Sequence, residues 1–261
     1  DSENFTLLMK ELRNALDQLE NKNGKHYELS IVMSAELDLL PTIQYDKVLN
    51  YVDFINMMTY DLSGSWNSYT SHQTPLYTNK AYNKNTMSGA KNSADACITY
   101  FEETYGSTID MSKILIGVAA YTRGWAKVQD DGLDKNNPGL YATAARNSVI
   151  NSDGNEGIYP FRDIEEIIQK YDLNEYFDNT AKAAYYYSAK NGYFFTCDNE
   201  QSVEAKGNYV RKKGLGGLIM WMASQDNNNK LQKAMFKSLF GENYSLPSQK
   251  PVYTHPNAKI N

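Results

Sequence analysis

The spacing of apolar residues changes along the chain between the 3.6-residue period of an amphipathic helix and the short runs of a buried strand. Residues 5–19 are predicted to form a helix, which Asp1 or Ser2 can cap, because apolar side chains recur there at helical spacing. Further helices are predicted at 88–105, 202–213 and 231–239, with a short one inside 39–49. Buried strands are predicted at 27–35, 52–60, 113–121 and 216–222.

Strands that alternate with helices indicate an α/β fold, in which both faces of a parallel sheet are covered. Four such β/α units occupy residues 1–124 and 196–240. The interval 125–195 does not fit the unit, and its own helix (161–171) and strand (183–188) predict an inserted α+β lobe before the last strand. Residues 241–261 lack periodicity and contain three Pro, which indicates a linker or a surface tail.

Four parallel strands do not close a barrel, and a sheet that ends there leaves two exposed edges, which proteins normally avoid. We therefore expect a further segment to complete the fold. The chain begins at Asp1 without a Met, as the middle of a longer polypeptide does, so its N-terminus carries no information on localisation.

Composition and charge argue against several classes of partner. The formal net charge is −5 and Lys and Arg are scattered, so we expect no nucleic-acid partner. The longest apolar run, residues 215–223, is half a membrane span, so we expect no membrane crossing. The three His residues lack metal-binding spacing and no Gly-rich phosphate loop is present, so we expect no cofactor and no metal. Cys97 and Cys197 match no metal or redox motif, and their pairing stays open.

Candidate chemistry lies at the ends of the predicted strands, where β/α barrels carry their working residues. Three strand ends each combine a large aromatic side chain with a hydrogen-bonding group, as a pyranose ring and its hydroxyls and amides require. The chain is also rich in Tyr, with 21 residues. The candidates are Met58, Tyr60, Asp61 and Trp66 after the second strand, Tyr121, Arg123 and Trp125 after the third, and Trp221 and Gln225 after the fourth.

Each candidate also has a purely structural interpretation. Trp221 suits a core position, Asp61 suits the cap of a turn, and Arg123 suits a surface ion pair. Trp66 and Trp125 suit the covering of hydrophobic surface. However, all three Trp residues of the chain lie at or just beyond strand ends on one face, which packing alone does not explain.

Several segments resemble the chitinases of glycoside hydrolase family 18. They are DSENFTLLMKELRNAL, FINMMTYD followed by GSW, GVAAYTRGW followed by a long insertion, and GLGGLIMWMASQD. The resemblance runs from Asp1 to Phe240 and implies the second half of a (β/α)8 TIM barrel, four β/α units with an α+β insertion before the last strand. The implied substrate is a β-1,4-linked N-acetylglucosamine polymer, chitin or chito-oligosaccharides.

The resemblance also implies roles for individual residues. Tyr60 and Asp61 match the pair that holds the substrate's 2-acetamido group, whose oxygen attacks the anomeric carbon in that family's chemistry. Met58 matches a position beneath that sugar, and Trp221 matches the hydrophobic floor under the −1 ring. The further substrate-binding candidates are Trp66, Tyr121, Arg123, Trp125 and Gln225.

The family's proton donor has no counterpart in this sequence. No segment has the form DGxDxDWE, and the acidic residues 163–166 and 198–200 are predicted as a helix flank and a helix cap. In the family, the donor strand lies just before the helix that opens this chain. We therefore expect the acid Glu to belong to a missing N-terminal half of the same barrel, and we expect this chain alone to be inactive.

Two alternatives keep the family and change the function. One is a chitinase-like lectin that binds sugar without catalysis, and the other is a member that acts on peptidoglycan. The presence of both Tyr60 and Asp61 favours an enzyme, and the Tyr-rich lobe favours a deep groove for a linear polymer. Because insoluble chitin lies outside cells, the resemblance implies a secreted protein.

Overall fold

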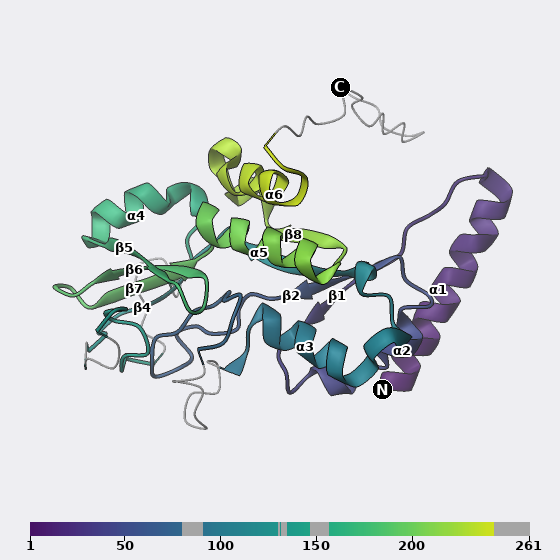
Figure 1. The fold of residues 1–261 in the computed structure, drawn as a ribbon, viewed down its shortest axis with the longest axis horizontal. Helices are drawn as coiled ribbons and strands as arrows, with labels where there is room; N and C mark the ends of the chain where they lie inside the picture. Colours follow the sequence, from purple (N-terminus) through teal and green to yellow (C-terminus); the bar gives the residue numbers. More distant parts are fainter. Residues whose placement is uncertain (80–90, 130, 132–134, 147–156, 243–261) are drawn as a thin grey trace.

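The computed structural model describes residues 1–79, 91–129, 131, 135–146 and 157–242, and these form two four-stranded sheets (Figure 1). The first sheet is parallel, with strand order β1-β2-β3-β8. Its strands are β1 (Ser30–Ser34), β2 (Phe54–Met58), β3 (Ile114–Ala119) and β8 (Gly217–Trp221). Each strand lies within one of the four apolar runs, so the predicted strands are confirmed, and each is shorter than its run.

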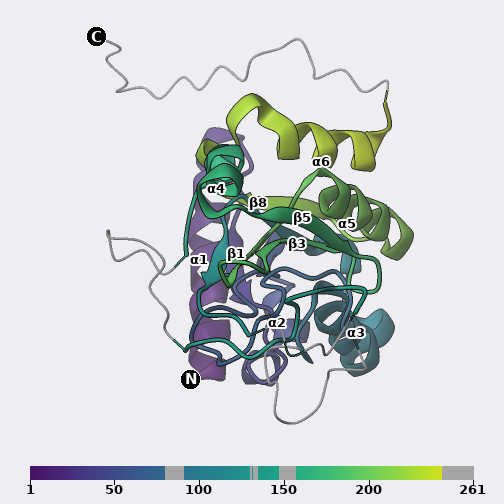
Figure 2. The same cartoon turned by 90° about the vertical axis from the view of Figure 1, so that its left-hand side faces the viewer.

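Helices lie before, between and after these strands. They include the α-helices α1 (Ser2–Asn23), α2 (Tyr45–Val48), α3 (Ala94–Tyr105), α5 (Glu200–Lys213) and α6 (Lys230–Phe240). Shorter 3-10 helices occupy Leu40–Thr42, Gly106–Thr108, Met111–Lys113, Phe161–Asp163, Ala223–Gln225 and Asn227–Asn229. In Figures 1 and 2, α5 and α6 lie side by side, while α1 lies at the opposite end of the molecule from the second sheet.

Several helix boundaries differ from the prediction, and two of these differences have clear local causes. The first helix continues past residue 19 to Asn23, and it ends where Gly24 adopts a left-handed conformation and donates its N–H to the carbonyl of Glu20. The helix predicted from residue 88 begins at Ala94 instead, because the Ser93 side chain accepts the Ala96 N–H and caps it. Residues 88–90 lie outside the described part of the chain.

The second sheet is antiparallel and lies between β3 and β8 in the sequence, with strand order β4-β7-β6-β5. Its elements are β4 (Arg123–Trp125), α4 (Ile164–Tyr171), β5 (Asn174–Asp178), β6 (Ala183–Ser188) and β7 (Tyr193–Cys197). The strand predicted at 183–188 is confirmed. In sequence, this sheet begins at Arg123 of β4 and ends at Cys197 of β7, so it extends slightly beyond the predicted lobe of 125–195.

Two apolar clusters hold the parallel sheet in place. Ile55 and Ile116 pack with Tyr45 of α2 and Phe101 of α3, whose ring centroids are 4.8 Å apart. Further along β3, a second cluster joins the strand to α5 and α6 through Val118, Val203 and Leu231. The strand ends that carry the candidate residues therefore project from a packed framework.

The structure also bears on the two Cys residues, on membrane crossing and on metal binding. Cys97 in α3 and Cys197 in β7 are both buried and free, which answers the question of their pairing. None of the described helices has both the length and the apolar character needed to cross a lipid bilayer. No group of His, Cys, Asp and Glu able to hold a metal ion occurs within the described residues.

Candidate active site

The carboxyl ends of β2, β3 and β8 meet around a hollow with a volume of about 420 Å³. The parallel register places Ala119 beside Trp221, so the residues that follow β3 lie next to the end of β8. The structure brings seven of the nine candidate residues to this hollow: Met58, Tyr60, Asp61, Tyr121, Arg123, Trp221 and Gln225. Val32 and Ile158 complete its lining.

Tyr60 is buried at the base of the hollow, and it lies directly over β3. Only a glycine on β3 permits this position, because a Cβ on Gly117 would lie 2.6 Å from two carbons of the Tyr60 ring. Burial, followed by the negative charge of Asp61, raises the pKa of Tyr60 to about 12. Its hydroxyl is therefore protonated at neutral pH and able to donate a hydrogen bond.

Asp61 is the next residue along the chain, and it turns its carboxylate toward the end of β3. Its backbone adopts a left-handed conformation (φ 58°), which Asp tolerates better than most residues. Arg123 Nε donates to Asp61 Oδ1 at 2.7 Å. The side chain of Asp61 is 40% exposed, so it remains accessible from the hollow. Arg123 therefore forms the ion pair that its structural interpretation predicts, and its partner is a carboxylate that itself lines the hollow.

Arg123 is also stacked on aromatic rings. Its guanidinium carbon lies 5.2 Å from the ring centroid of Trp66 and 5.8 Å from that of Tyr121, within the range of cation–π attraction. Burial, followed by the charge of Asp61, raises the pKa of Tyr121 well above its usual range. Asp61, Tyr121, Arg123 and Trp66 thus form one connected group of polar and aromatic side chains.

Trp221 and Gln225 form the β8 side of the hollow. Trp221 is 59% exposed, so among the described residues it does not occupy the core position that suits it in the sequence. Gln225 lies in the 3-10 helix that follows, and its Oε1 is buried without a hydrogen-bond partner among the described residues. A buried acceptor without a partner is costly, and a ligand that donates a hydrogen bond there removes the cost.

Trp66 extends the site along the strand ends. A smaller hollow of about 200 Å³ shares Asp61 with the first and is lined also by Trp66, Glu36 and Asp38. Trp66 is 38% exposed, so part of its ring is available to a ligand. The two hollows together give an elongated surface with an exposed Trp toward each end and Asp61 between them.

Trp125 does not line either hollow. Its side chain is fully buried in the core of the second sheet, where its ring packs edge-on against Phe194 at 5.6 Å. Its indole N–H donates to the carbonyl of Asn67. This position favours the packing interpretation of Trp125, because the ring presents no free face to a sugar.

The structure also reveals residues that the sequence analysis missed. Val32 is exposed on β1 beside the buried Ile31, and the continuous apolar run of Ile31, Val32 and Met33 contains no signal that separates the two. Ile158 reaches the hollow from the segment before α4, and no sequence pattern marks it. Gln73 and Lys206, both fully buried, support the strand ends through hydrogen bonds that only the folded chain brings together.

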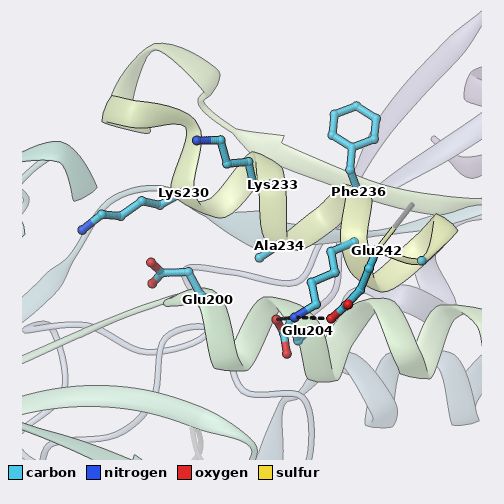
Figure 3. Close-up of a pocket in the computed structure, with 9 residues that line it drawn as sticks. Glu200, Glu204, Lys230, Lys233, Ala234, Phe236 and Glu242 are labelled. Atoms are coloured by element: carbon cyan, nitrogen blue, oxygen red, sulfur yellow. Dashed lines mark ion pairs between the residues drawn. The ribbon is translucent and has the colours of Figure 1, made fainter. Parts of the chain in front are cut away.

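A further hollow lies between α5 and α6, away from the strand ends (Figure 3). Its volume is about 670 Å³, and among its charged side chains Lys237 is paired with Glu204 and Glu242. None of the candidate residues lines this hollow, so we do not regard it as the candidate active site.

Comparisons with known proteins identify the family to which the chain is similar. The sequence profile of Glycosyl hydrolases family 18 matches residues 1–226. Chitinase A1 of Niallia circulans is 32% identical over 245 residues, which cover 90% of this chain and 33% of that protein. The chain spans a third to about half of the length of the curated relatives that it matches.

Solved structures give the same result. The multi-modular chitinase ChiW of a Paenibacillus species is 34% identical, with a TM-score of 0.76 over 91% of this chain and 20% of that one. A family 18 chitinase of Cycas revoluta is 25% identical, with a TM-score of 0.72 over 90% of this chain and 63% of that one.

Proposed function

This chain belongs to family 18 of the glycosyl hydrolases, and from that premise we propose that it forms the substrate-positioning part of a chitinase. The proposed substrates are chitin and chito-oligosaccharides, and the proposed reaction is hydrolysis of β-1,4 bonds between N-acetylglucosamine units with retention of configuration. The Cycas revoluta relative, solved with (GlcNAc)3, supports this class of substrate.

One observation carries the proposal: a protonated Tyr60 and an accessible Asp61 carboxylate lie side by side at the base of a hollow that Trp221 borders. An N-acetylglucosamine unit offers an apolar ring face, an amide N–H and an amide oxygen. In the proposed complex, Trp221 receives the ring face and Asp61 accepts the amide N–H. The Tyr60 hydroxyl donates to the amide oxygen, and Gln225 Oε1 accepts from a sugar hydroxyl.

In the proposed reaction, the acetamido oxygen attacks the anomeric carbon while the glycosidic bond breaks. The leaving oxygen takes a proton from an acid, and positive charge develops on the cyclised acetamido group. Water then opens this intermediate at the anomeric carbon and returns the proton. Tyr60 and Asp61 orient the amide for attack, and Asp61 stabilises the developing positive charge. Orientation and electrostatic stabilisation both accelerate such a step.

We propose that a segment outside residues 1–261 supplies the acid and completes the barrel. Asp61 is the only carboxylate among the described residues that line the main hollow, and it is bonded to Arg123. Several apolar side chains at β1 and α1 are exposed, including Val32 at 55% and Leu8 at 52%. Burial of such surface is favourable, which supports a partner segment there. Secretion also stands as a proposal, since insoluble chitin is extracellular.

Hydrolysis of a fluorophore-labelled chitotriose by the full-length protein tests the function. Tyr60→Phe removes one hydroxyl and Asp61→Asn removes one charge, and we expect each to lower kcat/KM by roughly 100-fold or more, as loss of one transition-state contact does. Tyr27→Phe is the matched control, because the Tyr27 hydroxyl is bonded to Asn23, far from the hollow. Unchanged turnover in both site variants is incompatible with the proposal, and binding without turnover in the unmodified protein identifies a lectin.

A further inference from the structure

Three consecutive polar side chains beyond β2 are almost completely buried. His72, Gln73 and Thr74 have exposed fractions of 1%, 0% and 1%, so their polar groups depend on partners within the protein. Those partners lie on both sheets. His72 Nε2 is 3.1 Å from Asp178 Oδ2 at the end of β5, whereas the Thr74 hydroxyl donates to the carbonyl of Thr59 at the end of β2. Residues 72–74 therefore connect the second sheet to the first through hydrogen bonds.

Gln73, the middle residue, contacts the active-site strand ends directly. Its Nε2 donates to the carbonyl of Tyr121 at 2.7 Å and to the carbonyl of Thr196, on β7, at 3.1 Å. Its Oε1 accepts the N–H of Asp61 at 3.4 Å. One side chain thus joins the segment that follows β2, the segment that follows β3 and the second sheet.

Only a primary amide satisfies all three groups at once. The two carbonyl oxygens need donors and the N–H of Asp61 needs an acceptor, and a side-chain amide carries both on adjacent atoms. A carboxylate of the same shape would face two carbonyl oxygens without a proton to offer. An apolar side chain would remove all three hydrogen bonds, and each buried group left without a partner costs about 1–3 kcal/mol.

The main chain of Gln73 holds the other side of Asp61. The N–H of Leu62 donates to the Gln73 carbonyl at 3.0 Å, so hydrogen bonds to Gln73 flank the left-handed Asp61 on both sides. Such a conformation is maintained only when its surroundings fix it. The direction of the Asp61 carboxylate toward the hollow depends on this conformation.

We infer that Gln73 is a positioning residue for the acetamido-binding pair. Its side-chain amide fixes the backbone of Asp61 and of Tyr121, and through them the spacing between the Asp61 carboxylate and the Tyr60 hydroxyl. This role rests on the proposed function, because it concerns recognition of the N-acetyl group. Gln73 itself does not line the hollow and makes no contact with substrate.

The test is the preference of the full-length protein for chitotriose over its fully deacetylated form, with each affinity measured as competitive inhibition of the initial rate at which labelled chitotriose is hydrolysed. Gln73→Met removes the amide, and Gln73→Glu keeps an acceptor but loses both donors. We expect each variant to reduce the ratio of the two affinities by roughly tenfold, equivalent to about 1.4 kcal/mol of lost acetamido recognition. Affinity for the deacetylated trimer is expected to change much less.

Gln44→Met is the matched control, because Gln44 also accepts a side-chain hydrogen bond, from Thr6, but lies far from the strand ends. It is expected to keep the full preference. A purely structural role for Gln73 lowers both affinities by the same factor, and either that result or an unchanged ratio in the folded variants overturns the inference. If the unmodified protein shows no preference for the N-acetylated trimer, the proposed function itself fails, and the inference fails with it.

Discussion

At the scale of single residues, the site depends on the absence of a side chain at Gly117. The Tyr60 ring occupies the space that a Cβ would fill, and the carbonyl of Met57, 3.2 Å from that Cβ position, limits any retreat of the strand. We expect Gly117→Ala to displace the Tyr60 ring and to lower kcat/KM on labelled chitotriose by on the order of 100-fold, as a misplacement of about 1 Å can.

A double-mutant cycle separates this effect from a general loss of stability. Tyr60→Ala removes the ring, so adding Gly117→Ala to that variant is expected to cause little further loss of activity. If the two losses simply add, Gly117 acts by another route and the steric explanation is wrong.

The candidate residues differ in how far the sequence could predict them. Those at strand ends were accessible to prediction, because the end of a parallel strand fixes which edge of the sheet a residue occupies. Trp125 follows the same rule, but β4 carries it into the core of the second sheet, which the order of apolar residues does not reveal. Gln73 is a polar residue in a loop, and its partners at 61, 121 and 196 are distant in sequence.

At the scale of elements, a buried ion pair ties α5 to the parallel sheet. Lys206 Nζ donates to Asp198 Oδ2 at 2.7 Å, to the Thr74 hydroxyl and to the carbonyl of Gly117. Burial lowers the pKa of Lys206, and the charge of Asp198 opposes that shift. Asp198 also accepts the N–H of Ala119, two residues before Tyr121.

We expect Lys206→Met to lower the free energy of unfolding by about 3–5 kcal/mol, because it leaves the Asp198 carboxylate buried without its cation. Urea-induced unfolding of the full-length protein measures this change. Adding Asp198→Asn to Lys206→Met is expected to recover part of the loss. Lys237→Met breaks an exposed ion pair with Glu204 and is expected to cost at most about 1 kcal/mol. Equal losses in Lys206→Met and Lys237→Met would contradict this assignment.

Helices and strands with a clear hydrophobic period were predicted well. The residues at which they begin and end, and the burial of their charged side chains, were predicted less well. The predicted helix at 202–213 gains two residues in α5, because Asn199 and Ser202 form a reciprocal capping box. Nothing in its polar sequence distinguishes Lys206, which is fully buried, from Lys212, which is exposed. That difference arises only when α5 packs on β3 and on the segment at Thr74.

At the scale of the whole molecule, α1 has an apolar stripe that the described residues leave uncovered. Leu8, Leu12 and Leu19 are 52%, 41% and 44% exposed, and their spacing places them along one side of the helix. Phe5 and Met9, on the adjoining part of the helix surface, pack on the main core. The apolar surface of α1 is therefore wider than the part that the main core covers, which is typical of a helix with a second packing partner. The β1 edge, with Val32 exposed, lies in the same half of the molecule (Figure 1).

If a partner segment covers this stripe in the full-length protein, Leu8→Gln and Leu12→Gln each remove a buried side chain. We then expect each to lower the free energy of unfolding by about 1.5–3 kcal/mol, the value of burying one Leu. On a stripe that stays exposed, the same substitutions cost no more than about 0.5 kcal/mol. Leu39→Gln, at an exposed Leu outside the stripe, is the control and is expected to be near neutral. Urea unfolding of the three variants therefore tests whether the chain is one layer of a larger barrel, and it does so independently of any sugar-binding assay.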